Sequence, residues 1–163
     1  MLTIHVGLHK TGSTAIQQHL SSRASSSARR LAFLGTDNLL GGNGFQVPRD
    51  SKQGHSRVLN VLAKHQNVVI SHEAFLGKGW SMYSEARQNA LAMLNHFAQH
   101  TDFRVVIYLR PQYQWFESVY THFVQKGNYE EPAEFVGRLA KAKYAYFSRL
   151  VDDLIETLDS HRL

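Results

Sequence analysis

Three short groups of residues in this sequence could act on an anionic ligand. The segment Gly7-Leu-His-Lys-Thr-Gly-Ser-Thr14 carries one lysine, Lys10, between its two glycines. The second group is the pair His72-Glu73, and the third is Arg110, which ends an apolar run. Lysine and arginine bind phosphate and sulfate groups well, while imidazole and carboxylate groups can exchange protons. If the fold brings these groups together, they make an anion-binding site.

The glycine segment is expected to be a turn between a strand and a helix. Leu2 to Val6 is apolar apart from Thr3 and His5, as in a buried strand, and a helix is expected to begin near Ser13. The amides of such a turn point inward, and the helix dipole adds positive potential at the same place. Ser13 and Thr14 can cap the helix or donate to a bound oxygen. These features predict a phosphate or sulfate site.

The rest of the chain alternates between strand and helix patterns. Further strands are expected at residues 68–70 and 103–109; helices at 56–65, at 84–100, after Pro111, and in two parts from Glu131; and a surface loop at 41–54. The serine-rich stretch 21–27 is expected to end the first helix, and the apolar run 31–34 is cut short by Gly35. The alternation predicts an α/β fold of three layers, α/β/α, around a short parallel sheet. Since ligands bind at the carboxyl ends of such strands, the three groups should meet at one edge.

Two motifs resemble the donor-binding segments of sulfotransferases that use 3′-phosphoadenosine 5′-phosphosulfate (PAPS). Residues 7–14 resemble the 5′-phosphosulfate loop, and Tyr-Leu-Arg-Pro-Gln-Tyr-Gln-Trp-Phe-Glu-Ser-Val-Tyr, residues 108–120, resembles the 3′-phosphate motif. In that motif an arginine ends a strand and a serine follows about two helical turns later, as Arg110 and Ser118 do here. The likeness is to bacterial and carbohydrate-type members. It implies a single domain over residues 1–163 with a P-loop-like phosphosulfate-binding loop.

The resemblance implies a role for each matched residue. Lys10 would lie beside the bridging oxygen of the phosphosulfate and neutralise the leaving phosphate. Arg110 and Ser118 would hold the 3′-phosphate. The donor would be PAPS, the product would be 3′,5′-ADP, and no metal would be needed. The residues expected to contact the donor through the loop are His9, Lys10, Thr11, Gly12, Ser13 and Thr14.

Transfer to a hydroxyl also needs a proton acceptor near the donor sulfur. Glu73 is the favoured base, His72 comes next, and His9 within the loop is a third candidate. Adjacent residues that leave a strand point apart, so only one of Glu73 and His72 should face the donor. We expect direct in-line transfer to a carbohydrate or small metabolite, with specificity set by the loops 35–54 and 76–83.

Two alternatives remain open from the sequence. A kinase-like site is disfavoured because the phosphate loop of kinases places lysine directly before Ser or Thr, whereas Gly12 precedes Ser13 here. Kinases also need an acidic residue to help hold magnesium, whereas the strand expected at 103–109 is followed by Arg110 and not by an aspartate. The other alternative is a module that binds the nucleotide but has lost catalysis.

Composition narrows the class of partner. The formal charge is +5, but lysine and arginine gather only at 29–30 and 141–143, which argues against a nucleic-acid partner.

The sequence has no cysteine, which removes disulfides and thiolate chemistry, and no apolar run long enough for a bilayer. With a strand starting at Leu2, we expect a cytoplasmic protein. His96 and His100 have zinc-ligand spacing but lack a third ligand, so a solvated helix face is expected.

The sequence also departs from the family pattern. The resemblance implies a further strand and a basic closing segment after the last helix, and residues up to Leu163 contain no counterpart to either. We therefore expect a domain shortened at its C-terminal end relative to the family. An uncovered sheet edge or helix face in such a domain would favour a homo-oligomer.

Overall fold

The computed structural model describes residues 1–26, 31–35 and 58–159. Four strands are present in these ranges: β1 (Leu2–His5), β2 (Leu31–Leu34), β3 (Asn67–Ser71) and β4 (Phe103–Val106). The helices are α1 (Ser13–Ser26), α4 (Ala86–Phe97), α5 (Gln112–Gln125), α6 (Pro132–Ala140), α7 (Phe147–Asp159) and the short 3₁₀ helix η1 (Gly79–Ser81). Residues 58–62 are also helical.

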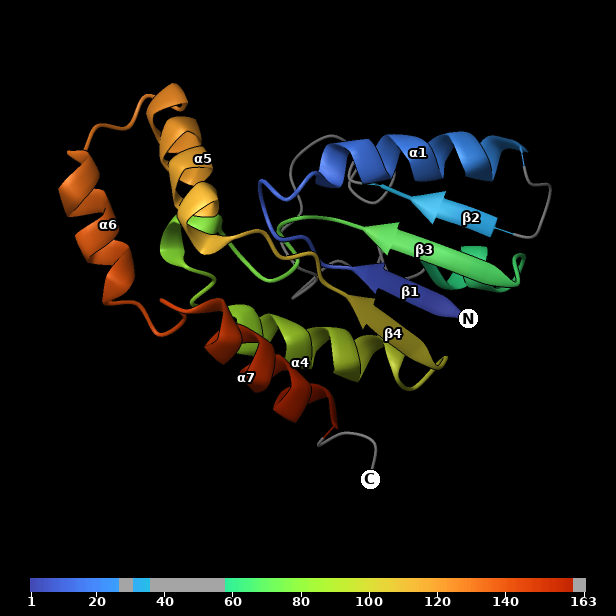
Figure 1. Cartoon of the computed structure of the whole chain (residues 1–163). Helices are drawn as coiled ribbons and strands as arrows, with labels where there is room; N and C mark the ends of the chain where they lie inside the picture. The colour runs from blue at the N-terminus through green and yellow to red at the C-terminus, as the bar shows by residue number, and fades with distance from the viewer. Residues whose placement is uncertain (27–30, 36–57, 160–163) are drawn as a thin grey trace.

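The four strands form one parallel sheet in the order β2-β3-β1-β4. His5, at the end of β1, is level with Ser71 on β3 and with Val106 on β4. The carboxyl ends of these three strands therefore lie at one edge of the sheet. In Figure 1 the strand arrows all point toward the side on which α5 stands.

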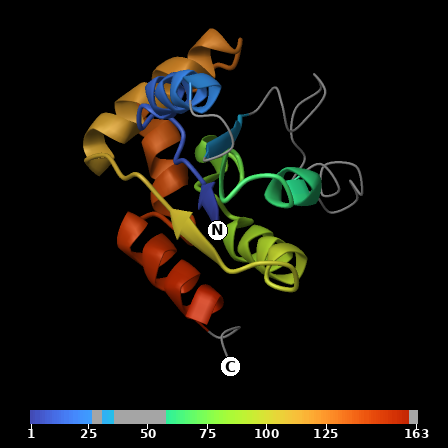
Figure 2. The same ribbon diagram turned by 90° about the vertical axis from the view of Figure 1, so that its right-hand side faces the viewer.

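Helices cover both faces of the sheet. α1 lies on one face, and α4 and α7 lie together on the other, in both views (Figures 1 and 2). This confirms the expected α/β class with a parallel sheet between helical layers. α5 and α6 stand beyond the carboxyl edge, where α5 packs against η1 and α6 (Figure 1).

The core lies mainly around β1, a central strand of the sheet whose four residues are all buried. Leu2 and Ile4 of β1 are fully buried, as is Val68 of β3, and Trp115 of α5 is buried at the edge of the same core. Full burial of an aliphatic side chain contributes about 1.5–3 kcal/mol.

The structure differs from the sequence-based assignment in two elements, and a third ends where it was expected to. Residues 31–34 form a strand, β2, which pairs with β3, although Gly35 ends it after four residues. α1 ends at Ser26, within the serine-rich stretch 21–27 that was expected to end it. β4 ends at Val106 instead of Leu109, because the positive φ of Gly7 interrupts the regular ladder, although the Tyr108 backbone still forms hydrogen bonds with Gly7 and Leu8.

Other expectations are met or lie outside the described residues. The C-terminal helix does break into two parts, α6 and α7, and Pro111 directly precedes α5. The expected surface loop at 41–54 lies outside the described residues. The helix expected at 56–65 is described only from Val58 onward, and it is helical there.

Candidate anion site

The loop after β1 presents a run of free amides beside the N-terminus of α1. Gly7 and Gly12 have positive φ angles of 98° and 86°, and Lys10 between them has a φ of 62°. The carbonyl of Gly12 accepts from the amides of Ala15 and Ile16, which starts the helix. The amides of residues 10–14 have no acceptor in the part of the chain that the structure describes. Unsatisfied amides at a helix N-terminus are suited to binding an anion.

The middle of the loop is held by two aromatic side chains from distant segments. The His9 amide donates to the Tyr83 hydroxyl at 2.9 Å, and the indole Nε1 of Trp115 donates to the His9 carbonyl at 2.9 Å. Tyr83 and Trp115 are both fully buried. Local spacing in the sequence predicts neither contact, because the partners lie 74 and 106 residues from His9.

Glu73 lies against the loop from the end of β3. The Ser13 hydroxyl donates to Glu73 Oε2 at 2.6 Å, and Ser13 itself is buried. A Cβ on Gly7 would come within 2.9 Å of the Glu73 carbonyl oxygen, so glycine lets the two backbones approach. Oε1 of Glu73 accepts no hydrogen bond from the described residues. The carboxylate is therefore placed beside the free amides, with one oxygen available.

His72 contacts other neighbours than Glu73 does. Its imidazole packs edge-on against Phe75, with ring centroids 5.6 Å apart, and its Nδ1 accepts from the Ala74 amide at 2.9 Å. Burial lowers the pKa of His72 to about 4, although the charge of Glu73 opposes this shift. The imidazole is therefore neutral at neutral pH. Of the two adjacent residues, Glu73 is the one that contacts the loop.

Arg110 reaches back to the loop from the segment after β4. Its Nη1 donates to the Lys10 carbonyl at 3.3 Å, and its Nε donates to Gln114 Oε1 at 3.3 Å. The backbone on this side is also tied to β1, because the Tyr108 amide donates to the Gly7 carbonyl at 2.8 Å. Ser118 is half-buried on α5 and forms no hydrogen bond with the loop. The first and third groups from the sequence therefore meet at this edge.

The charge balance at the loop favours an anion. The Lys10 side chain is exposed, and the Arg110 guanidinium has no carboxylate partner among the described residues. Burial lowers the pKa of His9; Glu73 opposes the shift, while His122 and Lys10 add to it. Thr11 donates to the Leu8 carbonyl at 2.6 Å, which stabilises the turn, and Thr14 is exposed on the first turn of α1.

Within the described ranges, no cluster of three or more metal-ligating side chains is present. None of the helices described combines the length and apolarity that a bilayer crossing requires. Neither finding identifies a ligand.

Comparison with protein-family models, with curated proteins and with solved structures finds no match.

Proposed function

We propose that this protein is a sulfotransferase that moves a sulfuryl group from PAPS to a hydroxyl group of a carbohydrate or small metabolite. The observation that carries the proposal is the contact between Arg110 and the Lys10 carbonyl, at 3.3 Å. This contact joins the two motifs, residues 7–14 and 108–120, that would bind the 5′- and 3′-phosphates of one donor. A generic anion site at a helix N-terminus needs no second motif of this kind.

In this proposal the P-loop-like turn holds the phosphosulfate. The free amides of residues 10–14 and the α1 dipole bind the 5′-phosphate oxygens, and the Lys10 ammonium neutralises the charge on the leaving oxygen. Arg110 binds the 3′-phosphate, and Ser118 adds a hydrogen bond from α5. Both cations act by fixed charge, so neither needs to change its protonation state.

Glu73 is the proposed base. The Ser13 hydroxyl donates to its Oε2 and so fixes the carboxylate. Its Oε1 is available to take the proton of the substrate hydroxyl that attacks sulfur. The hydroxyl oxygen attacks sulfur as the bond between sulfur and the bridging oxygen breaks, and 3′,5′-ADP leaves. His72 is a poorer candidate because its ring is buried against Phe75.

The direct test measures binding and transfer separately. Thermal unfolding is followed with 3′,5′-ADP, with PAPS and with ATP plus magnesium, and transfer from labelled PAPS is then screened over hydroxyl acceptors. The proposal requires a rise in melting temperature with 3′,5′-ADP and labelled product with at least one acceptor. Binding without transfer would reduce it to a nucleotide-binding module. An unchanged melting temperature with both 3′,5′-ADP and PAPS would refute it.

One observation favours a second candidate, a magnesium-dependent phosphotransferase. In P-loop enzymes a loop hydroxyl and an acidic residue on a neighbouring strand together hold magnesium. Ser13, at the start of α1, and Glu73, just after β3, are joined by a hydrogen bond of 2.6 Å and resemble such a pair. A shift that appears only with ATP plus magnesium, with no response to 3′,5′-ADP, would select this candidate.

A further inference from the structure

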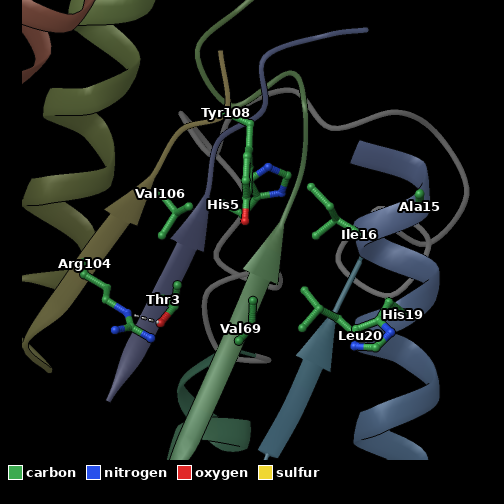
Figure 3. Close-up of a pocket in the computed structure, with 10 residues that line it drawn as sticks. All are labelled: Thr3, His5, Ala15, Ile16, His19, Leu20, Val69, Arg104, Val106 and Tyr108. Carbon is green, nitrogen blue, oxygen red and sulfur yellow. Dashed lines mark hydrogen bonds between the residues drawn. The ribbon is translucent and has the colours of Figure 1, made fainter. Parts of the chain in front are cut away.

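A cavity of about 530 Å³ lies between α1 and the part of the sheet that α1 leaves open. α1 packs against β2, so the same face of β1 and β4 is not covered by the helix. The wall is mostly apolar, with Ile16 and Leu20 from α1 facing Val69 and Val106 from the strands (Figure 3). None of the loop residues 7–14 lines it. This size and lining are typical of small-molecule sites.

A buried histidine supplies a polar group without a partner in this cavity. His5 is 2% exposed, lines the cavity and has no hydrogen-bond partner for Nε2. Its Nδ1 lies 2.7 Å from the Ser71 hydroxyl, which accepts from Gln17 Nε2 at 3.1 Å. We assign the Ser71 hydroxyl as the donor to Nδ1, since its oxygen already accepts from Gln17. A neutral imidazole that accepts at Nδ1 carries its hydrogen on Nε2. The neutral imidazole thus holds an unused donor.

Arg104 supplies positive charge at the end of the cavity opposite His5 (Figure 3). Arg104 is exposed on β4, and its Nε donates to the Thr3 hydroxyl at 2.9 Å. No carboxylate of the described residues forms an ion pair with it. Figure 3 shows Arg104 and Thr3 at one end of the cavity and His5 beside Tyr108 at the other. The remaining guanidinium donors suit a carboxylate, which binds arginine in a bidentate manner.

We infer that this cavity binds a small amphipathic carboxylate, with its acid group on Arg104 and its apolar chain between α1 and β1. His5 would donate to an oxygen only in a ligand that carries one along its chain, and the unsubstituted acid tests the Arg104 contact and the apolar wall alone. The inference does not depend on the proposed transfer reaction, because it concerns a different set of side chains. It names a chemical class: a medium-chain carboxylic acid, for which decanoate is a suitable probe.

The test is decanoate binding to the full chain by calorimetry, below the concentration at which decanoate forms micelles. Three comparisons locate the site: decanol, which lacks the charge; Arg104→Gln, which removes the cation; and Arg149→Gln, on α7 across the sheet, as the matched control. We expect saturable decanoate binding that is at least tenfold weaker for decanol and for Arg104→Gln, and unchanged for Arg149→Gln. Nuclear Overhauser contacts from decanoate should reach the Ile16 and Leu20 methyl groups.

Equal decanoate affinity in Arg104→Gln and the unaltered chain would overturn the inference, as would the absence of saturable binding. A further result would replace it. If Ile16→Asp converts a self-associated form to a monomer while decanoate has no effect on association, the open face is an interface between copies of the chain.

Discussion

Arg110 and Lys10, which are 100 residues apart in sequence, are joined by a hydrogen bond from Nη1 to the carbonyl oxygen, at 3.3 Å. The contact uses the backbone of Lys10, so both cationic side chains remain available to a ligand. In the proposed function these two cations, held beside one loop, would contact a ligand with two phosphate groups without a rearrangement of the chain.

Arg110→Gln should weaken 3′,5′-ADP binding by about 10-fold to 100-fold, the usual range for losing a hydrogen bond from a charged group. Titration calorimetry at fixed salt gives the dissociation constants. The control is Arg149→Gln, which removes an equal charge from exposed α7. If both variants lose affinity equally, only net charge matters, and Arg110 has no specific phosphate contact.

Lys10 occupies a backbone conformation that favours glycine, with a φ of 62°. Lys10→Gly should raise the free energy of unfolding by about 1 kcal/mol relative to Lys10→Ala, because a left-handed conformation costs an L-residue roughly this much. Both variants should lose sulfuryl transfer. Urea unfolding and the labelled-donor assay test the two parts. A Lys10→Gly protein that retained transfer would remove Lys10 from the proposed mechanism.

Glu73→Gln should lower turnover by about 100-fold or more, the usual contribution of a general base, with little change in 3′,5′-ADP affinity. Glutamine keeps the shape and can still accept from Ser13, so the loop should stay in place. Initial rates at saturating donor give turnover. Glu134→Gln, on the exposed first turn of α6, serves as the control. Unchanged turnover in Glu73→Gln would move the base elsewhere.

Gly7→Ala should destabilise the protein by about 2 kcal/mol more than Gly127→Ala. Both glycines have positive φ angles, 98° and 82°. They differ in space, because an added Cβ at Gly7 would lie 2.9 Å from the Glu73 carbonyl, whereas Gly127 has nothing within 4 Å. Urea unfolding of both variants separates the clash from the φ strain. Equal losses would mean that the approach of Gly7 to Glu73 is not tight.

His72 should make the protein less stable as the pH falls. Its pKa is lowered to about 4 in the folded state, from a usual value of 6.5. Between these values the unfolded chain binds a proton that the folded chain does not, so the free energy of unfolding decreases. The loss should reach about 2 kcal/mol between a pH of about 7.5 and a pH of about 5.

His72→Asn removes the titrating group and keeps a side-chain acceptor for the Ala74 amide. Urea unfolding at the two pH values should show a smaller decrease for this variant than for the unaltered chain. His100→Asn, at the exposed end of the segment after α4, should follow the unaltered chain. An identical decrease in all three proteins would show that protonation of His72 does not limit stability.

The sequence predicted the elements that have local signals. Continuous β-branched residues at 68–70 and a glycine-bounded turn at 7–12 depend on neighbours in the chain, and both appear where they were expected. The break between α6 and α7 also follows from local composition. The α/β class follows from their alternation, because a parallel sheet needs a crossover after each strand.

Tertiary contacts decided the remaining elements. Residues 31–34 are too short and too quickly ended to predict as a strand, and pairing with β3 makes them one. The opposite happens in β4, where residues 107–109 have strand composition but lie outside the regular ladder, which the positive φ of Gly7 interrupts although Tyr108 still bonds to the backbone of Gly7 and Leu8. β-structure depends on distant partners, which a local pattern does not contain.

For the site, the sequence identified the residue types: a lysine in a glycine turn, a histidine-glutamate pair and an arginine at a strand end. The tertiary structure decided which of them meet. Ser13 donates a hydrogen bond to Glu73, and His72 packs against Phe75. The His9 backbone is hydrogen-bonded to Tyr83 and Trp115. The physical reason is that a strand's position in the sheet and the direction of each side chain are set by packing across the whole chain, whereas residue type and spacing are local.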